Sequence, residues 1–555
     1  MRRVVLLAVA LVLPLMVWAK RSLTAPEGVT VMGVVTCQGV PVEGVTVSDG
    51  ALFTQTDKDG AYYLRSLKFY GSVFVITPSG YEPVTRRNVL PQFWAPLQRN
   101  KMQKVEQHDF ELRRVDNTRH RVIFTADMHF SSRNEDMLQF KRLCIPALKR
   151  AVAEVRDSIP TYSVILGDMC RNDSWYSQEI DPTDALAILT SLRYPAMAYT
   201  VMGENEYDGA IPAGIMTDHE ASELYATSCA PRFYSFNIGD VHYVVIDTTL
   251  FRNDAGDGKY STEIVGKRNF DIRVTADCLA WLRRDLALVE DKATPIVLCM
   301  HHGALRANNK GALVKSFTKP EYTDSLVNCV KDFSRVHFVS AHNHQRRVSV
   351  VKSLKHITEH SVGSIGGIQW ESAYNHFPHI TRDGAAAGFE VFDWEGRNVM
   401  WYHNCVDHPA KSTFRAYDMN AVGEYYRTNE DVRNFMRAYP GKRVDYGGAG
   451  FENSIYINYW GNEPKSKLEV WEGDKPLKVK RIYQDDPIAT LSTAVVRHKN
   501  SRGRKISVNR NSSQCLFVAK ADSAHTTIRI RTTDPFGRIY TDSLVRPAAF
   551  NPMRK

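Results

Sequence analysis

Four short hydrophobic runs divide the middle of the chain, and polar residues follow each of them closely. An apolar, β-branched run of about four to eight residues is typical of a strand buried in an α/β sheet. Ligands of such sheets bind just beyond the carboxyl ends of the strands. The pattern therefore predicts four buried strands that end in functional residues: VIFT before Asp127, YSVIL before Asp168, PIVLC before His301 and VHFVS before His342.

Two amphipathic stretches between these runs predict helices that cover the sheet. In the stretch from Met137 to Val155, hydrophobic side chains recur at helical spacing. A second stretch follows Thr275, a residue type that caps helices, and carries an apolar stripe formed by Leu279, Leu282, Leu286 and Val289. The segments RFYSFNIG and VHYVVIDT, separated by Asp240, predict a hairpin. Together these elements indicate an α/β domain from 117 to 406.

The regions on either side are rich in β-type residues. From 29 to 112, short runs alternate with turn dipeptides, which predicts an amino-terminal β-sandwich. There, TDKDGAYYL places Asp57 and Asp59 before Gly60, and we interpret it as a hairpin turn because the remaining ligands of a calcium loop are absent. From 412 to 549, the runs NSIYINYW, KLEVWEG, TTIRIRTTD and FGRIYTD predict a carboxyl-terminal β-rich domain.

The first 19 residues differ from the rest of the chain. Arg2 and Arg3 precede an apolar run from Val4 to Trp18, and Ala19 ends a small-residue cleavage pattern. This arrangement predicts a signal peptide over residues 1–19 and a periplasmic or secreted bacterial protein. No later stretch approaches about 20 apolar residues, so we expect no integral membrane segment after cleavage.

Composition and charge narrow the classes of partner. The 555-residue chain has 43% hydrophobic and 24% charged residues, which is typical of globular domains. Its net charge of +10 is spread along the chain, so nucleic-acid binding is not expected, and we interpret the basic run from Arg497 to Lys505 as a solvated loop. The nine cysteines show no CxxC pair and predict no disulfide framework. Composition predicts no oligomeric state.

The polar residues at the strand ends have the chemistry of metal ligands. Asp127 and His129 are two residues apart, as are His342 and His344. Alternation along an extended chain directs residues i and i+2 to the same side, so each pair could bind one cation.

The order of these motifs resembles the calcineurin-like metallophosphoesterases. The chain reads D127-M-H129, G167-D168, G203-E-N-E206, H301-H302 and A341-H-N-H344. The resemblance implies a metallophosphoesterase β-sandwich flanked by helices, with the added amino- and carboxyl-terminal β domains of a bacterial subfamily. It also implies a binuclear site for two divalent metal ions, such as Mn, Fe or Zn.

The resemblance assigns the ligands residue by residue. Asp168 would bridge the two ions. The first ion would bind Asp127, His129 and His344, and the second would bind His301, His342 and Glu204. The family pattern His-x-Pro favours His301 over His302 as the ligand, although Gly303 replaces the proline. His302 is then a candidate catalytic residue.

The sequence departs from the family at Gly203-Glu204-Asn205-Glu206. Glu204 stands where a neutral amide normally binds metal, and Asn205 stands where a histidine normally contacts the phosphate and the leaving group. Asn205 is thus the second candidate catalytic residue, although an amide does not titrate and cannot protonate a leaving alkoxide. His302 and Glu206 are the next candidates for a general acid.

Two function classes agree with these residues. The first is a secreted phosphoesterase in which a metal-bound hydroxide attacks a phosphate ester, preferentially a phosphodiester, of a small molecule or glycan. The second is a non-catalytic or weakly active periplasmic binding protein that retains the metal site. Trp370, in the Gly-rich segment SVGSIGGIQWES, either lines the substrate pocket or packs in the core.

Overall fold

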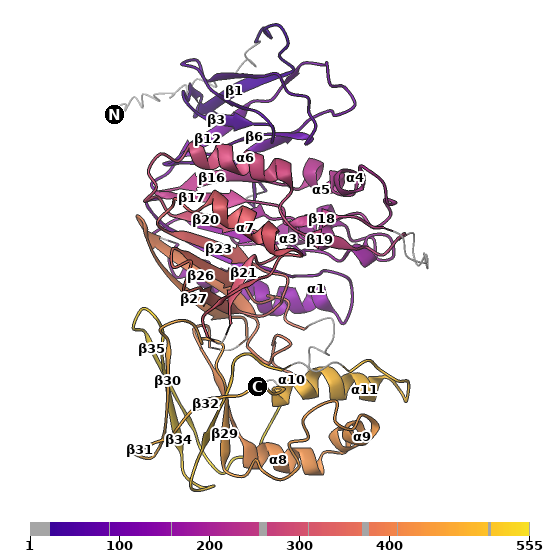
Figure 1. Ribbon diagram of the computed structural model, residues 1–555, viewed down its shortest axis with the longest axis vertical. Helices are drawn as coiled ribbons and strands as arrows, with labels where there is room; N and C mark the ends of the chain where they lie inside the picture. The colour runs from indigo at the N-terminus through magenta and orange to yellow at the C-terminus, as the bar shows by residue number, and fades with distance from the viewer. Residues whose placement is uncertain are drawn as a thin grey trace, which may run out of the picture.

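The computed structural model describes residues 23–87, 89–156, 158–254, 264–308, 310–368, 377–407, 409–508 and 512–553. The predicted signal peptide and Trp370 lie outside these residues. Three regions follow one another along the long axis of the molecule (Figure 1). Among the described residues, no helix is both long enough and apolar enough to cross a bilayer.

The amino-terminal region is the predicted β-sandwich. Its buried core is formed by residues such as Val31, Val47 and Leu112. One sheet contains β1 (Val31–Cys37), β2 (Val40–Pro41), β5 (Ala61–Leu64), β7 (Tyr81–Pro83), β11 (Glu106–Gln107) and β12 (Phe110–Arg114). The other contains β3 (Thr46–Ser48), β4 (Phe53–Gln55), β6 (Ser72–Val75) and β10 (Trp94–Pro96), and β8 (Thr85–Arg86) pairs with β9 (Leu90–Pro91).

The turn in TDKDGAYYL is not the hairpin that its sequence predicts. The Asp57 carboxylate accepts hydrogen bonds from the Asp59 and Ala61 backbone amides, both at 2.9 Å. Gly60 has φ +72°, which glycine adopts most easily. However, β4 and β5 belong to different sheets, so this turn carries the chain from one sheet to the other.

The central region contains two mixed sheets. The first has the order β15 (Met197–Thr200), β14 (Thr161–Ile165), β13 (Arg119–Thr125), β26 (Gly388–Glu395) and β27 (Asn398–Cys405). The second has the order β16 (Tyr234–Ile238), β17 (Val241–Val245), β20 (Ile296–Cys299), β23 (Val336–Ser340), β25 (Ile357–Ser361) and β24 (Arg347–Val350). The predicted hairpin is confirmed, because β16 and β17 are antiparallel neighbours.

Both predicted cover helices are present. The stretch from Met137 forms α1 (Asp136–Gln139), a π-helical segment (Phe140–Cys144) and α2 (Ile145–Ala153) in succession. Thr275 caps α6 (Ala276–Ala287), since its hydroxyl accepts a hydrogen bond from the Cys278 amide at 3.3 Å. The other central helices are α3 (Pro182–Ser191), α4 (Thr217–Ala221), α5 (Glu223–Ser228) and α7 (Pro320–Cys329), with 3₁₀ turns at Asn172–Ser174 and Glu204–Glu206. Short strands β18 (Thr249–Phe251), β19 (Phe270–Ile272), β21 (Leu305–Ala307) and β22 (Leu313–Lys315) form two ribbons.

The carboxyl-terminal region combines two sheets with helices that the β-rich pattern does not predict. One sheet contains β28 (Arg415–Asp418), β29 (Ser454–Asn458), β33 (Leu516–Lys520) and β32 (Lys480–Arg481). The other contains β31 (Lys475–Pro476), β30 (Lys467–Glu472), β34 (Ile528–Thr533) and β35 (Ile539–Leu544). The helical elements are α8 (Met419–Thr428), α9 (Glu430–Ala438), α10 (Pro487–Ala489), a π-helical segment (Thr490–Val495) and α11 (Val496–Asn500). These helices have their own core, in which Val422, Tyr426 and Phe435 are buried.

Candidate metal centre

The strands converge on one site through their carboxyl ends. Asp127 and Asp168 follow β13 and β14 of the first central sheet. His301 and His342 follow β20 and β23 of the second. Both pairs of strands are parallel neighbours within their sheets, so their ends lie together. The site therefore forms where the two sheets of the central sandwich present the same end.

The backbone that follows β13, β14 and β23 is not extended, although strand alternation predicts an extended exit. Five candidate ligands have positive φ angles: Asp127 (+53°), His129 (+49°), Asp168 (+53°), His342 (+64°) and His344 (+57°). A non-glycine residue in this left-handed region costs about 1–3 kcal/mol and persists only where its surroundings hold it. The loops thus turn sharply after each strand, and the fold stores backbone strain at this site.

A group of three donors forms one half of the site. The Nε2 atoms of His129 and His344 are 3.1 Å apart, and His344 Nε2 is 3.7 Å from Asp127 Oδ1. Asp127 is buried, and its Oδ2 atom has no hydrogen-bond partner among the described residues. A buried carboxylate oxygen beside two imidazoles fits a cation, because a bound ion would replace the missing partner.

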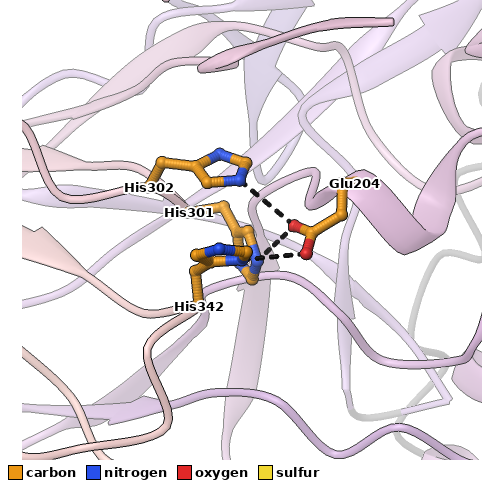
Figure 2. A group of neighbouring side chains, drawn as sticks. All are labelled: Glu204, His301, His302 and His342. Atoms are coloured by element: carbon orange, nitrogen blue, oxygen red, sulfur yellow. Dashed lines mark ion pairs between the residues drawn. The ribbon is translucent and has the colours of Figure 1, made fainter. Parts of the chain in front are cut away.

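A second group surrounds the Glu204 carboxylate with three imidazoles (Figure 2). His301 Nε2 and His302 Nε2 lie 2.8 Å and 3.3 Å from Glu204 Oε2. His342 Nδ1 lies 2.8 Å from Glu204 Oε1. The four donors suit a divalent transition metal, for which imidazole and carboxylate are common ligands.

Asp168 connects the two groups. Its Oδ2 atom is 3.5 Å from His129 Nε2 in the first group and 3.5 Å from His301 Nε2 in the second. A carboxylate in this position can be shared by two ions. The structure therefore brings together all seven residues that the resemblance names as ligands, and it adds His302 to the second group.

The surrounding backbone fixes the orientation of the ligands. His301 Nδ1 lies 2.6 Å from the Leu166 carbonyl oxygen, which can only accept, so Nε2 is the nitrogen that faces the site. His302 Nδ1 is 3.1 Å from the Thr248 hydroxyl. The same hydroxyl accepts a hydrogen bond from the His302 backbone amide. Thr248 lies just after strand β17. Its position at a strand end is therefore the sequence signal that could have identified it as a site residue.

Glu206 ties together the two loops that carry Asp168 and Glu204. Its carboxylate accepts hydrogen bonds from the backbone amides of Asp168, Met169 and Gly203 at 2.7–2.8 Å. Gly203 is required here, because a Cβ atom would lie 2.4 Å from Asp168 Oδ1. Glu206 thus has a structural role, and its engaged oxygens argue against its being the general acid.

Asn205 is held by the metal centre itself. Its side-chain amide donates a hydrogen bond of 2.7 Å to Asp168 Oδ2, and its backbone amide donates to Asp168 Oδ1 at 3.0 Å. Its side-chain oxygen accepts from the Asn172 amide at 3.2 Å. Asn205 therefore orients the carboxylate that links the two groups.

Burial and mutual charge perturb the site strongly. Burial raises the pKa of Asp127 to about 8. Burial alone would raise the pKa of Glu204, but the charges of His301 and His342 hold it well below its usual range. Burial lowers the pKa of His302 to about 4, so this ring is neutral at pH 7 and available as a lone-pair donor. Metal binding would release the proton that Asp127 retains at pH 7, because carboxylates and neutral imidazoles are the forms that bind metal.

Three family models match the chain. Residues 120–346 match the family model of the calcineurin-like phosphoesterases. Residues 29–115 and 359–540 match the models of the N terminal and C terminal of calcineurin-like phosphoesterase. No curated protein matches the chain in sequence.

The solved structures that are similar to the chain share little sequence with it. A purple acid phosphatase from yellow lupin is 12% identical with a TM-score of 0.34, over 53% of this chain and 52% of that one. A dimetal phosphatase from Danio rerio is 11% identical with a TM-score of 0.30, and the match covers 51% of this chain and 95% of that one. A 5'-nucleotidase from Candida albicans is 11% identical with a TM-score of 0.28, over 52% and 51%. The chain thus spans about half the length of the lupin protein.

Proposed function

Since the chain belongs to the calcineurin-like phosphoesterase family, we propose that it is an exported, metal-dependent hydrolase of phosphodiesters. The observation that carries the proposal is the pair of donor groups joined by Asp168. Two ions bound there would acidify a water molecule and neutralise charge on the phosphate. Export rests on the predicted signal peptide alone.

Some residues of the site would bind the metal ions, and others orient the residues that bind them. Asp127, His129 and His344 would hold one ion, while Glu204, His301 and His342 would hold the other, with Asp168 between them. Asn205 and the Leu166 carbonyl orient Asp168 and His301 by the hydrogen bonds described above. Such supporting contacts typically change metal affinity or activity by about 10–100-fold.

Turnover of a nitrophenyl phosphodiester by the purified chain tests the proposal. We expect hydrolysis with added manganese, its loss in EDTA, and its recovery when manganese is returned. Bound metal should approach two ions per chain by elemental analysis. A chain that binds two ions and cleaves none of a panel of phosphodiesters and monoesters would contradict the enzymatic role.

The absence of a titrating group at position 205 favours a second candidate function, a binding protein with weak activity. The amide of Asn205 cannot protonate a leaving alkoxide, and the pKa of His302 near 4 makes this ring a poor proton donor at pH 7. We therefore expect nitrophenyl diesters, whose leaving group needs no proton, to react much faster than alkyl diesters.

The variant Asn205→His separates the two candidates. It supplies a titrating ring at that position and should narrow the gap between alkyl and nitrophenyl diesters by part of the roughly 10²–10⁴-fold that general acid catalysis provides. Wild-type chain that cleaves both esters equally well would show that another residue supplies the proton. Amino-terminal sequencing of the exported protein tests the predicted start at Lys20.

A further inference from the structure

A basic cleft of about 750 Å³ lies between the central and carboxyl-terminal regions. Six cationic side chains line it, three from each region: Arg133, Arg171 and Arg382, and Arg497, Arg504 and Lys505. We call these six residues and the space between them the basic cleft. The run from Arg497 to Lys505, which the sequence pattern presents as a solvated loop, contains the end of α11 and faces the central region.

The cleft carries a large excess of positive charge. Asp173 pairs with Arg171 at 3.0 Å and with Arg133 at 3.5 Å. Among the described residues, Arg497, Arg504 and Lys505 form no ion pair, and all three are exposed. Like charges that are gathered in a concave surface repel one another and attract anions, so a bound anion would stabilise this arrangement.

The cleft lies beside the first donor group of the metal centre. Arg133 is on the loop that carries His129, and Arg171 follows Asp168 by three residues. The loops that carry these two candidate ligands thus also carry one wall of the basic cleft.

Hydrogen bonds join the central and carboxyl-terminal regions beside the cleft. The turn that carries Arg382 is bonded to the carboxyl-terminal region through the two residues that follow Arg382. Asn458 donates to the Asp383 carbonyl at 2.9 Å, and Arg415 donates to the Gly384 carbonyl at 2.8 Å. Nearby, the buried Arg346 donates to the Trp460 carbonyl at 3.0 Å. The turn that carries Arg382 therefore packs directly against the carboxyl-terminal region.

We propose that the basic cleft binds a second phosphate group of the substrate. The substrate class is then a phosphodiester whose alcohol carries a further phosphate. The metal centre would hold the scissile group, and the cleft would hold the other. Planar guanidinium groups suit this task, because each can donate two parallel hydrogen bonds to phosphate oxygens. This inference rests on the proposed phosphodiesterase function.

Two nitrophenyl alkyl phosphodiesters that differ only in a terminal phosphate on the alkyl arm test the proposal. With the manganese-loaded full chain, we expect kcat/KM for the ester with the terminal phosphate to exceed that of the ester without it at least about tenfold, the effect of one charge-assisted hydrogen bond. The variant Arg497→Ala/Arg504→Ala/Lys505→Ala should lose most of this preference. The matched control Lys58→Ala/Lys331→Ala/Lys355→Ala removes three exposed cations elsewhere and should retain it.

A ratio near one in wild type, or an unchanged ratio in the cleft variant, would overturn the inference. Should the triple variant fold poorly, Arg133→Gln/Arg382→Gln removes two cations from the opposite wall and should lower the same ratio. Both variants are compared with wild type by thermal unfolding.

A binding measurement separates failure of the cleft from failure of the proposed activity. Calorimetric titration of inorganic tripolyphosphate in excess EDTA reports on the cleft while the metal centre is stripped. Binding by wild type that weakens at least about tenfold in the cleft variant supports the inference even if neither ester is cleaved. Binding that is absent in wild type, or equal in both, overturns it.

Discussion

At the scale of single residues, Asp168 is the side chain that contacts both donor groups of the metal centre. Its carboxylate faces one histidine of each donor group and accepts two hydrogen bonds from Asn205. Replacing it changes both halves of the site together, whereas replacing Asp127 or His342 changes mainly one.

We therefore expect Asp168→Asn to lower bound metal at both sites. The neutral amide offers a weaker donor for two cations, and its nitrogen would face the Asn205 amide or an imidazole. Elemental analysis of the purified variant measures the effect, and His342→Ala provides the comparison with one site affected. Retention of two ions by Asp168→Asn would show that Asp168 does not bridge.

His302 makes a contrasting prediction. Without its ring, Glu204, His301 and His342 still offer three donors to the second ion. We expect His302→Ala to keep both ions and His301→Ala to lose the second ion, because His301 Nε2 also lies 3.5 Å from the Asp168 carboxylate that joins the two groups. Metal analysis of the two variants side by side gives the answer. Loss of one ion in His302→Ala alone would transfer the ligand role from His301 to His302.

At the scale of elements, strands β23 and β25 bury a pair of histidines away from the metal centre. His337 Nδ1 and His360 Nε2 are 3.0 Å apart, and both rings pack against Phe392 and Trp401. Burial lowers the pKa of His337 to about 3 and holds that of His360 well below its usual value.

This pair should make stability depend on pH. Below about pH 6.5 the two imidazoles bind protons in the unfolded chain but stay neutral in the folded one. The free energy of unfolding therefore falls as the pH drops from about 6.5 toward 3. Each ring contributes up to about 1.4 kcal/mol per pH unit. Urea unfolding between pH 7 and pH 5 measures the slope. His337→Gln should show a shallower slope than wild type, and an equal slope would contradict this origin.

At the scale of the whole molecule, the amino-terminal sandwich shares its core with the central region. Phe93 packs against Tyr234 and Tyr199, with ring centroids 4.7 Å and 5.6 Å apart. The rings of Phe74 and Trp281 of α6 pack edge to face with their centroids 6.1 Å apart. The Trp281 indole also donates a hydrogen bond to the Ser48 hydroxyl at 3.3 Å. The indigo strands and α6 accordingly lie against each other in Figure 1.

This shared core predicts that the two regions unfold together. Phe93→Ala should lower the free energy of unfolding by about 3–5 kcal/mol, the usual cost of removing a buried phenyl ring. Denaturant unfolding followed by tryptophan fluorescence and by far-ultraviolet circular dichroism should give one coincident transition. Val40→Ala, at an exposed strand position of the same region, serves as the control. Two separate transitions would show that the regions are thermodynamically independent.

Much of this organisation follows from local sequence patterns. The apolar runs before Asp127, Asp168, His301 and His342 predict buried strands, because burial on both faces requires continuous hydrophobic side chains. Thr275 and the stripe that follows it predict α6, because capping and helical periodicity act within a few residues. The identities of the donor residues also follow from the sequence, since only certain side chains bind metal.

Other features depend on contacts between residues that are far apart in the chain. The left-handed loops at Asp127 and His342 persist because strands from two sheets hold them, so strand alternation gives the wrong reason for their proximity. The bond between Asn205 and Asp168, the path of the turn at Gly60 and the placement of Arg497 beside Arg133 arise in the same way. Local patterns determine which elements form and which chemistry they carry. Packing between distant segments determines where those side chains meet.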